Sequence, residues 1–151
     1  MSTYPFTRAL VTGASSGIGL EIVEQLGAAK VGLVVVARRE DRLREIERRF
    51  PGTEVIVADL VTPEGVKAVV DRISNPHLPE IDLVVNNAGF GVWGKFESTP
   101  LKQIVEMMEV NMSAMVKLTH LLLPEMEKQT PAYILNIAST AAYQAVPTLG
   151  C

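Results

Sequence analysis

A glycine-rich stretch at residues 11–19 constrains this chain more than any other feature. An apolar run at 9–11 leads into it, as a buried parallel strand would, and apolar residues recur at helical spacing after it. The glycines therefore lie at a strand-to-helix turn, where free backbone N–H groups and the helix dipole favour an anion. Gly13 permits the tight turn, Gly17 lets a diphosphate approach the backbone, and Gly19 lets the helix pack closely on its strand.

The spacing of these glycines is Gly-x-x-x-Gly-x-Gly, which differs from the Gly-x-Gly-x-x-Gly of the general dinucleotide motif. A glycine cluster taken alone can equally be an ordinary turn. The surrounding strand–turn–helix unit, together with residues farther along the chain, is what favours a phosphate-binding loop.

Length and composition indicate one globular domain. A chain of 151 residues with 48% apolar and 21% charged residues can bury a core and is not disordered. A net charge of −3 gives no indication of a nucleic-acid or membrane partner. The single cysteine, Cys151, permits neither an internal disulfide nor a cysteine metal cluster, and no metal site is expected. Since no signal peptide or membrane-length apolar run is present, we expect a cytoplasmic protein.

Strands and helices alternate along the chain. Helices are predicted to start at Thr62-Pro63 and at Thr99-Pro100, and a longer helix at about Asn111. This alternation predicts an α/β fold with a Rossmann-type, doubly wound parallel sheet. Right-handed crossovers give the strand order 3-2-1-4-5. The predicted strands are 9–11, 31–37, 54–58, 81–85 and 132–137.

Two apolar stripes on the later helices are predicted to face the core. Pro124 is predicted to kink the longer helix or to mark its last turns. The first stripe is Leu101, Ile104, Val105 and Met108, and the second is Met112, Met115, Val116, Thr119, Leu122, Leu123 and Met126.

The polar and glycine-rich clusters all fall where predicted strands end. Ligands bind a sheet of this kind outside the carboxyl ends of its strands, near the point where the strand order reverses. Packing alone does not require this coincidence, so we infer a ligand site there. The clusters are 13–19, Arg38-Arg39, Asp59, 86–89 and Ser139.

Together these motifs resemble the short-chain dehydrogenase/reductase family over essentially the whole chain. The resemblance rests on 12–19, Asp59-Leu60, 86–89, Asn111 and 136–139, in the order and spacing of the family. No single one of these motifs is specific. The resemblance implies a nicotinamide-dependent oxidoreductase that passes a hydride between the cofactor and a carbonyl or alcohol substrate.

The resemblance also implies roles for individual residues. The glycine loop would hold the cofactor diphosphate, Asp59 and Leu60 would lie beside the adenine, and Asn111 would hold a water in a proton relay. Ser139 would polarise the substrate carbonyl or hydroxyl. The implied catalytic residues are Ser139 and Asn111, and the implied cofactor-binding residues are Gly13, Ser15, Ser16, Gly17, Ile18, Gly19, Arg38, Arg39, Asp59, Leu60, Asn87, Ala88 and Gly89.

Structural alternatives exist for most of these residues. Asp59 and Asn111 could each cap a helix, and Asn86-Asn87 could serve only to form a turn. Ser139 taken alone would be an ordinary loop serine, and Arg38-Arg39 could lie on the solvated face of a charge-rich helix.

Cofactor preference follows from the residues that end the second strand. An acid there would bond the ribose 2′-hydroxyl and repel a 2′-phosphate. Here Ala37 is followed by Arg38 and Arg39, and a guanidinium matches a phosphate in charge and geometry. NADP(H) is therefore predicted in preference to NAD(H). Ser16 occupies the loop position at which many phosphate-preferring relatives carry a basic residue.

The sequence departs from the family pattern after Ser139. Family members carry a general acid/base tyrosine about thirteen residues later, in a Tyr-x-x-x-Lys motif. That position would follow Cys151, and no tyrosine of this sequence has a lysine at the required spacing. We therefore expect residues 1–151 to be a single, incomplete NAD(P)-binding domain, truncated before the remaining strands of the family.

Two function classes stay open. One is an NADP-dependent oxidoreductase of small carbonyl or alcohol substrates, inactive as this chain alone. The other is a non-catalytic NADP-binding module. A methyl-donor-binding enzyme is a third possibility, which the glycine loop disfavours. We expect a homo-oligomer for the full-length form and self-association of this chain, because its fifth strand would be an exposed sheet edge.

Overall fold

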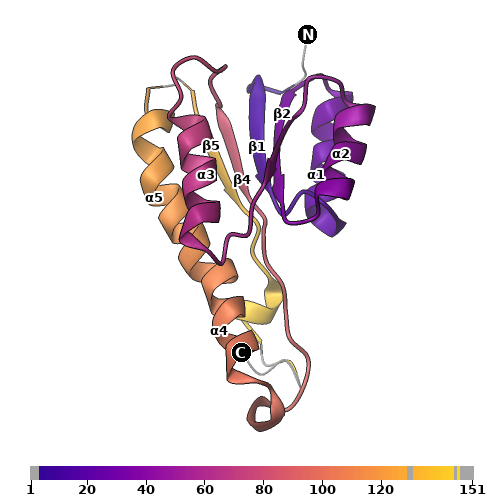
Figure 1. Ribbon diagram of the computed structural model, residues 1–151, viewed down its shortest axis with the longest axis vertical. Coiled ribbons are helices and arrows are strands. Elements are labelled where there is room, and N and C mark those ends of the chain that lie inside the picture. The colour runs from indigo at the N-terminus through magenta and orange to yellow at the C-terminus, as the bar shows by residue number, and fades with distance from the viewer. Residues whose placement is uncertain (1–3, 129–130, 145, 147–151) are drawn as a thin grey trace.

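Five parallel strands form one sheet in the order β3-β2-β1-β4-β5 (Figure 1). The computed structural model describes residues 4–128, 131–144 and 146. Every neighbouring pair of strands is parallel. The predicted Rossmann-type sheet and its strand order are therefore confirmed, and the predicted strands differ only at their ends. The strands are β1 (Arg8–Thr12), β2 (Gly32–Ala37), β3 (Glu54–Val57), β4 (Leu83–Asn86) and β5 (Tyr133–Asn136).

Helices follow the strands in alternation. Thr62 caps α3 by accepting a hydrogen bond from the Gly65 amide, and Pro63 occupies the first helical position, as predicted. Pro124 lies in the last turns of α5. The helices are α1 (Gly17–Ala28), α2 (Glu40–Arg49), α3 (Pro63–Ile73), α4 (Leu101–Met108) and α5 (Met115–Met126), with short turns η1 (Phe96–Ser98), η2 (Glu109–Ala114) and η3 (Thr140–Ala142).

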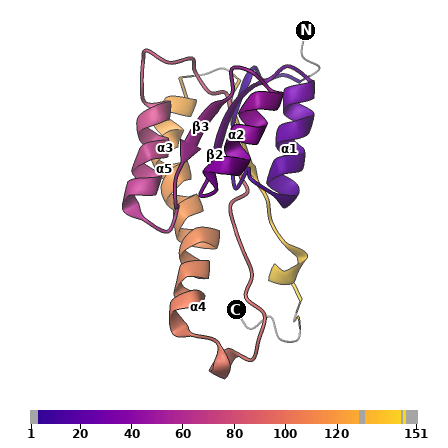
Figure 2. The same cartoon turned by 45° about the vertical axis from the view of Figure 1, so that its right-hand side comes forward.

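The sheet lies between two helical layers, and each layer has its own core. Helices α1 and α2 cover one face, and α3 and α5 cover the other (Figures 1 and 2). Successive side chains of β1 alternate between the cores, with Ala9 and Val11 on the first face and Leu10 on the second. Because the crossovers after β1 and β4 lead to opposite faces, the sheet opens at the carboxyl ends of these two strands.

The longer helix differs from the prediction in where it starts. The predicted longer helix does not start at Asn111, because α4 continues through the π-helical turn η2 into α5, and Asn111 lies inside that turn. A π turn is wider than an α turn and rotates the residues after it. The buried side chains of α4, η2 and α5 are therefore Ile104, Met107, Ala114, Leu118, Leu122 and Met126.

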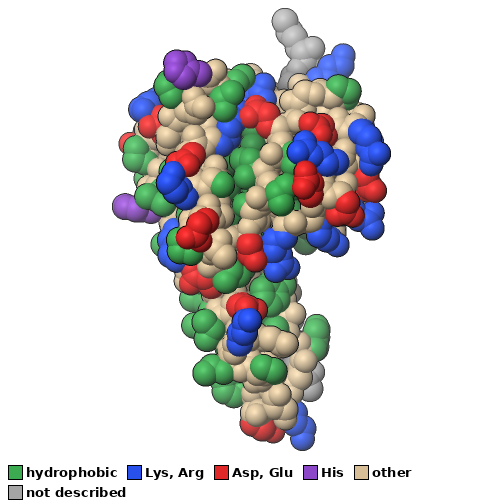
Figure 3. All heavy atoms as spheres, viewed as in Figure 1, with side chains coloured by type: hydrophobic (Ala, Val, Ile, Leu, Met, Phe, Trp, Pro, Cys, Tyr) green, Lys and Arg blue, Asp and Glu red, His purple; other side chains and the backbone are tan. Residues whose placement is uncertain are grey.

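Part of the predicted apolar stripes is wrong. Leu101, Val105, Met108, Met112 and Val116 are all at least half exposed. Helix α4 extends past the carboxyl ends of the strands, where no sheet lies beneath it (Figure 2). Hydrophobic side chains accordingly appear over the lower part of the surface in Figure 3, where α4 lies. Leu123 of the second stripe is also exposed.

Candidate functional site

A cleft of about 1050 Å³ lies at the carboxyl ends of the strands. Its walls come from the glycine loop, the end of β2, the residues after β3, β4 and β5, and the turn η2. Every residue predicted to bind cofactor or to act in catalysis lines this cleft, apart from Gly19. The fold thus brings together clusters that are far apart in the sequence.

The three glycines of the loop have different surroundings. Gly13 has φ +66°, and a Cβ there would lie 2.8 Å from the Ala88 Cα. A Cβ on Gly19 would collide with the Gly13 carbonyl, so Gly19 serves the packing of α1 on the loop. Gly17 has φ +58°, and a Cβ there would meet no atom within 4 Å. Gly17 therefore faces open space in the cleft, where a ligand can approach the backbone.

The start of α1 has no side-chain cap, although Ser16 occupies the N-cap position. Serine is among the preferred N-cap residues because its oxygen can accept from an N–H of the first turn. Here the Ser16 hydroxyl is turned away from the helix and accepts instead from Arg39. The first-turn N–H groups of α1 are consequently left for another acceptor, which an anion in the cleft can supply.

Thr12 and Asn87 hold the glycine loop against β4. The buried Thr12 hydroxyl accepts from the Asn87 and Ala88 amides, both at 3.0 Å, and donates to the Val85 carbonyl. The Asn87 side-chain Nδ2 donates to the carbonyls of Thr12 and Gly13, at 3.0 and 3.3 Å. Asn87 therefore does more than form a turn: it fixes the loop that it adjoins.

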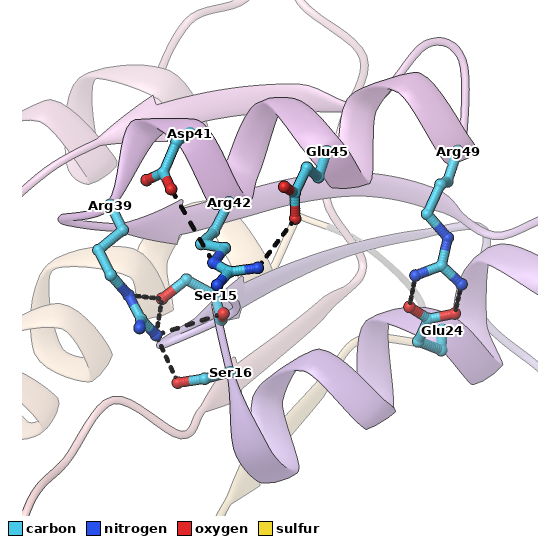
Figure 4. Close-up of polar contacts among 8 residues, drawn as sticks. All are labelled: Ser15, Ser16, Glu24, Arg39, Asp41, Arg42, Glu45 and Arg49. Carbon is cyan, nitrogen blue, oxygen red and sulfur yellow. Dashed lines mark hydrogen bonds and ion pairs between the residues drawn. The ribbon is translucent and has the colours of Figure 1, made fainter.

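Arg39 lies across the glycine loop (Figure 4). Its Nη2 donates to the Ser16 Oγ at 2.6 Å, to the Ser15 Oγ at 3.0 Å and to the Ser15 carbonyl at 3.3 Å, and its Nε also reaches the Ser15 Oγ. Arg38 has a looser contact, with 3.9 Å between its Nη1 and Oδ2 of Asp59. The Arg39 guanidinium therefore lies over the glycine loop, and the Arg38 guanidinium lies near Asp59, which follows β3.

Asp59 does not cap α3, because Thr62 does. The Asp59 carboxylate accepts from the Val61 amide at 3.1 Å, and its side chain is 41% exposed beside the cleft. Leu60 is buried and lines the same wall. This pair can therefore contact a flat ring lying between β2 and β3.

Asn111 does not cap a helix either. It lies within η2, and its side-chain amide pairs with the backbone of Phe90. The turn around it carries an ion pair between Glu109 and Lys117. The hydrogen bond from the Lys117 ammonium, together with one from Ser113, holds the pKa of the Glu109 carboxyl below its usual value.

Ser139 caps the short turn η3 at the end of β5. Its Oγ accepts from the Ala141 amide at 3.1 Å. A hydroxyl that accepts one hydrogen bond still has its proton to donate. Ser139 can therefore donate a hydrogen bond into the cleft, to an oxygen of a bound molecule.

A polar tie joins β4, β5 and α5, in which Asn86 donates to Asn136 at 2.8 Å and to Thr119 at 3.1 Å. Sequence reasoning missed an apolar wall beside Asn111. Its signal is the apolar spacing of Met112 and Met115, which the sequence analysis assigns to the core. The wall consists of Phe90, Met107, Val110, Met112 and Met115.

A sequence profile of the short chain dehydrogenase family matches residues 7–151. The chain belongs to this family. The loop 12–19 and the motifs at 86–89 and 136–139, which carry the resemblance in the sequence, lie around one cleft.

Similar proteins extend beyond the part matched here. An uncharacterised oxidoreductase of Staphylococcus epidermidis is 34% identical over 145 residues, which are 93% of this chain and 61% of that protein. The present chain thus spans about three fifths of the length of that relative.

Two solved structures share the fold. A short-chain dehydrogenase from Sphingobium yanoikuyae in complex with NADPH has a TM-score of 0.87 and 28% identity, covering 95% of this chain and 57% of that one. L-sorbose reductase from Gluconobacter frateurii, complexed with NADPH and L-sorbose, has a TM-score of 0.84 and 32% identity, covering 95% and 56%. Among the residues that the structure describes, no helix is long and apolar enough to cross a membrane.

Proposed function

We propose that this chain binds NADP(H) in the cleft and forms the cofactor-binding part of a carbonyl/alcohol oxidoreductase. The observation that carries the proposal is the uncapped start of α1. Its first-turn N–H groups are not used by Ser16, and Gly17 faces open space beside them. A diphosphate placed there accepts from backbone donors and gains from the helix dipole.

The 2′-phosphate of the cofactor lies at the end of β2 in this proposal. Ala37 leaves no carboxylate at that end, and Arg38 and Arg39 follow it directly. Asp59 and Leu60 lie beside the adenine. Two NADPH-bound relatives of the same fold support the preference for the phosphorylated cofactor.

The substrate end of the cleft holds Ser139 and Asn111. Ser139 donates its free hydroxyl proton to the substrate oxygen and so polarises the carbonyl. Asn111 helps to hold a water for proton transfer and keeps Phe90 in place at the mouth of the site. When bound, the nicotinamide supplies the hydride donor or acceptor at its C4 atom.

General acid/base chemistry needs a further group. Tyr143 is 89% exposed and has Pro147, not lysine, four residues later. Turnover is therefore proposed only for a protein that also supplies a Tyr-x-x-x-Lys pair. This observation favours, for the 151 residues alone, the second candidate function, a non-catalytic NADP(H)-binding module.

Oligomerisation and a cytoplasmic location are also part of the proposal. The exposed apolar side chains on α4 and α5 support self-association. The apolar wall beside Asn111 favours a substrate with an apolar group next to its carbonyl.

Calorimetric titration with NADPH and NADH, followed by a turnover assay with carbonyl substrates, tests the proposal. We expect NADPH to bind more tightly than NADH, and we expect no turnover by this chain alone. Equal affinities would contradict the proposed NADP(H) preference. Binding of neither nucleotide would contradict both candidate functions.

A further inference from the structure

Arg39 differs from three arginines of α2 in the kind of group that it contacts. Arg42, Arg44 and Arg49 are each paired with carboxylates, and Figure 4 shows Arg42 with Glu45 and Arg49 with Glu24. Arg39 forms no ion pair with any described residue, and its contacts are with the neutral oxygens of Ser15 and Ser16. Its positive charge is therefore not neutralised by a neighbour.

The contacts use only part of the Arg39 guanidinium. The Nε and Nη2 atoms donate to the loop, whereas Nη1 donates to no described residue. An arginine held in this way keeps N–H donors available for an anion. It is also fixed beforehand, so less side-chain freedom is lost when an anion binds.

The Ser16 hydroxyl makes the shortest of these contacts, at 2.6 Å. It is able to do so because it does not cap α1. Ser16 therefore combines two effects: it leaves the helix N–H groups open for the diphosphate, and it holds the cation for the 2′-phosphate.

From this geometry we propose that Ser16 is a specificity-positioning residue, which sets the preference for NADP(H) by fixing Arg39 over the glycine loop. This inference rests on the proposed NADP(H) binding. The ligand chemistry that Ser16 selects is an adenosine carrying a 2′-phosphate, and Ser16 acts on it through Arg39. Ser15 assists with its hydroxyl and its carbonyl.

Binding of 2′,5′-ADP and of 5′-AMP to the 151-residue chain tests the inference, because these probes differ in the 2′-phosphate. The variants are Ser16→Ala, Ser16→Thr, Arg39→Ala and the Ser16→Ala/Arg39→Ala double variant. We expect Ser16→Ala to weaken 2′,5′-ADP binding about tenfold and Arg39→Ala to weaken it about 100-fold, as lost hydrogen bonds to charged groups do. Binding of 5′-AMP should change little in either variant.

Two further readouts separate positioning from a structural role. Ser16→Thr keeps the hydroxyl and should restore 2′,5′-ADP binding. Ser16→Ala should cause no further loss in the Arg39→Ala background, because the cation that it positions is then absent. Ser74→Ala, at the exposed end of α3, and Arg44→Ala, on α2, are the matched controls and should leave both affinities unchanged.

The outcomes distinguish a failure of the proposed NADP(H) preference from a failure of the proposed role of Ser16. If the unmodified chain binds 2′,5′-ADP no better than 5′-AMP, the proposed NADP(H) preference is wrong. If it discriminates and Arg39→Ala weakens 2′,5′-ADP binding while Ser16→Ala leaves it unchanged, the role of Ser16 is wrong. Equal weakening of both probes by Ser16→Ala would also overturn that role, because it would indicate an effect on the shared 5′-phosphate site.

Discussion

The side-chain amide of Asn111 makes hydrogen bonds in both directions with the backbone of Phe90. Its Oδ1 accepts from the Phe90 N–H at 3.0 Å, and its Nδ2 donates to the Phe90 carbonyl at 2.9 Å. The π-helical turn η2 is thereby joined to the loop that follows β4. Asn111 thus fixes the position of an aromatic residue that lines the cleft.

Replacing Asn111 tests this role. Asn111→Asp retains the acceptor for the Phe90 amide but places a carboxylate against the Phe90 carbonyl. We expect a loss of about 1–2 kcal/mol in unfolding free energy, typical of a broken hydrogen bond that leaves a repulsive contact. Hydrogen exchange measured by NMR should show faster exchange of the Phe90 amide in Asn111→Ala, and slower exchange in Asn111→Asp than in Asn111→Ala. Unchanged protection in both variants would contradict the role.

Substitutions of the loop glycines should affect stability and cofactor binding to different extents. Gly13→Ala places a Cβ 2.8 Å from the Ala88 Cα, so it should cost several kcal/mol of stability, since both backbone strain and a clash are introduced. Gly17→Ala meets nothing within 4 Å and should cost only about 1–2 kcal/mol, from its left-handed backbone. Urea denaturation measures both changes.

Gly17→Ala, the less destabilising of these two changes, should have a large effect on cofactor binding. Among protein that is folded, Gly17→Ala should weaken NADPH binding at least tenfold, because the methyl group occupies the approach to the first-turn N–H groups. Gly52→Ala is the matched control: Gly52 also has a positive φ and open space, but it lies outside the cleft. Equal effects of Gly17→Ala and Gly52→Ala on NADPH affinity would show that the loop does not hold the diphosphate.

The ion pair in η2 predicts a dependence of stability on pH. Pairing with Lys117 lowers the pKa of Glu109 in the folded state, so the pair stabilises the protein above the unfolded carboxyl pKa of about 4.3. That contribution is lost as the pH falls through the lower folded value. The stability difference between the unmodified chain and Lys117→Met should therefore shrink as the solution is acidified.

Denaturation curves measured between neutral and acidic pH test this dependence. Lys102→Met serves as the control, because Lys102 pairs with Glu106 at a longer distance of 3.7 Å on an exposed part of α4. A pH-independent difference for Lys117→Met would contradict the coupling between Glu109 and Lys117.

The exposed apolar side chains of α4 and α5 predict self-association. Val105 and Val116 are 54% and 60% exposed, and neither lines the cleft. Val105→Glu and Val116→Glu should shift the sedimentation profile towards smaller species without weakening NADPH binding. Lys102→Glu, on the same helix as Val105, controls for the added negative charge. An unchanged profile in both valine variants would place association on another surface.

The fold was predictable because the apolar patterns, the helix-start signals and the topology rules all indicate the same arrangement. Apolar runs alternate with helical patterns, Thr62-Pro63 marks a helix start, and the crossover rule leaves one strand order. The clustering of Gly13, Arg39, Asp59 and Ser139 followed from their positions at strand ends. These features depend on local sequence and on topology, both of which can be inferred without coordinates.

The π turn and the exposed stripe were not predictable in the same way. Asn111 lies inside a helix because its amide is satisfied by Phe90, a residue brought close only by the tertiary fold. Val105 faces solvent because α4 extends past the sheet. A helical repeat of apolar residues predicts which face of a helix is apolar, but it does not predict which element packs against that face. The Arg39–Ser16 contact likewise joins two loops whose separation only the fold determines.

A crystal structure of the chain with NADPH tests the central claim most directly. The account predicts the diphosphate against the first-turn N–H groups of α1 beside Gly17, and the 2′-phosphate within hydrogen-bonding distance of the Arg39 guanidinium. Ser16 should still contact Arg39 in that complex. Cofactor bound away from the glycine loop, or a 2′-phosphate that contacts neither Arg38 nor Arg39, would contradict the account.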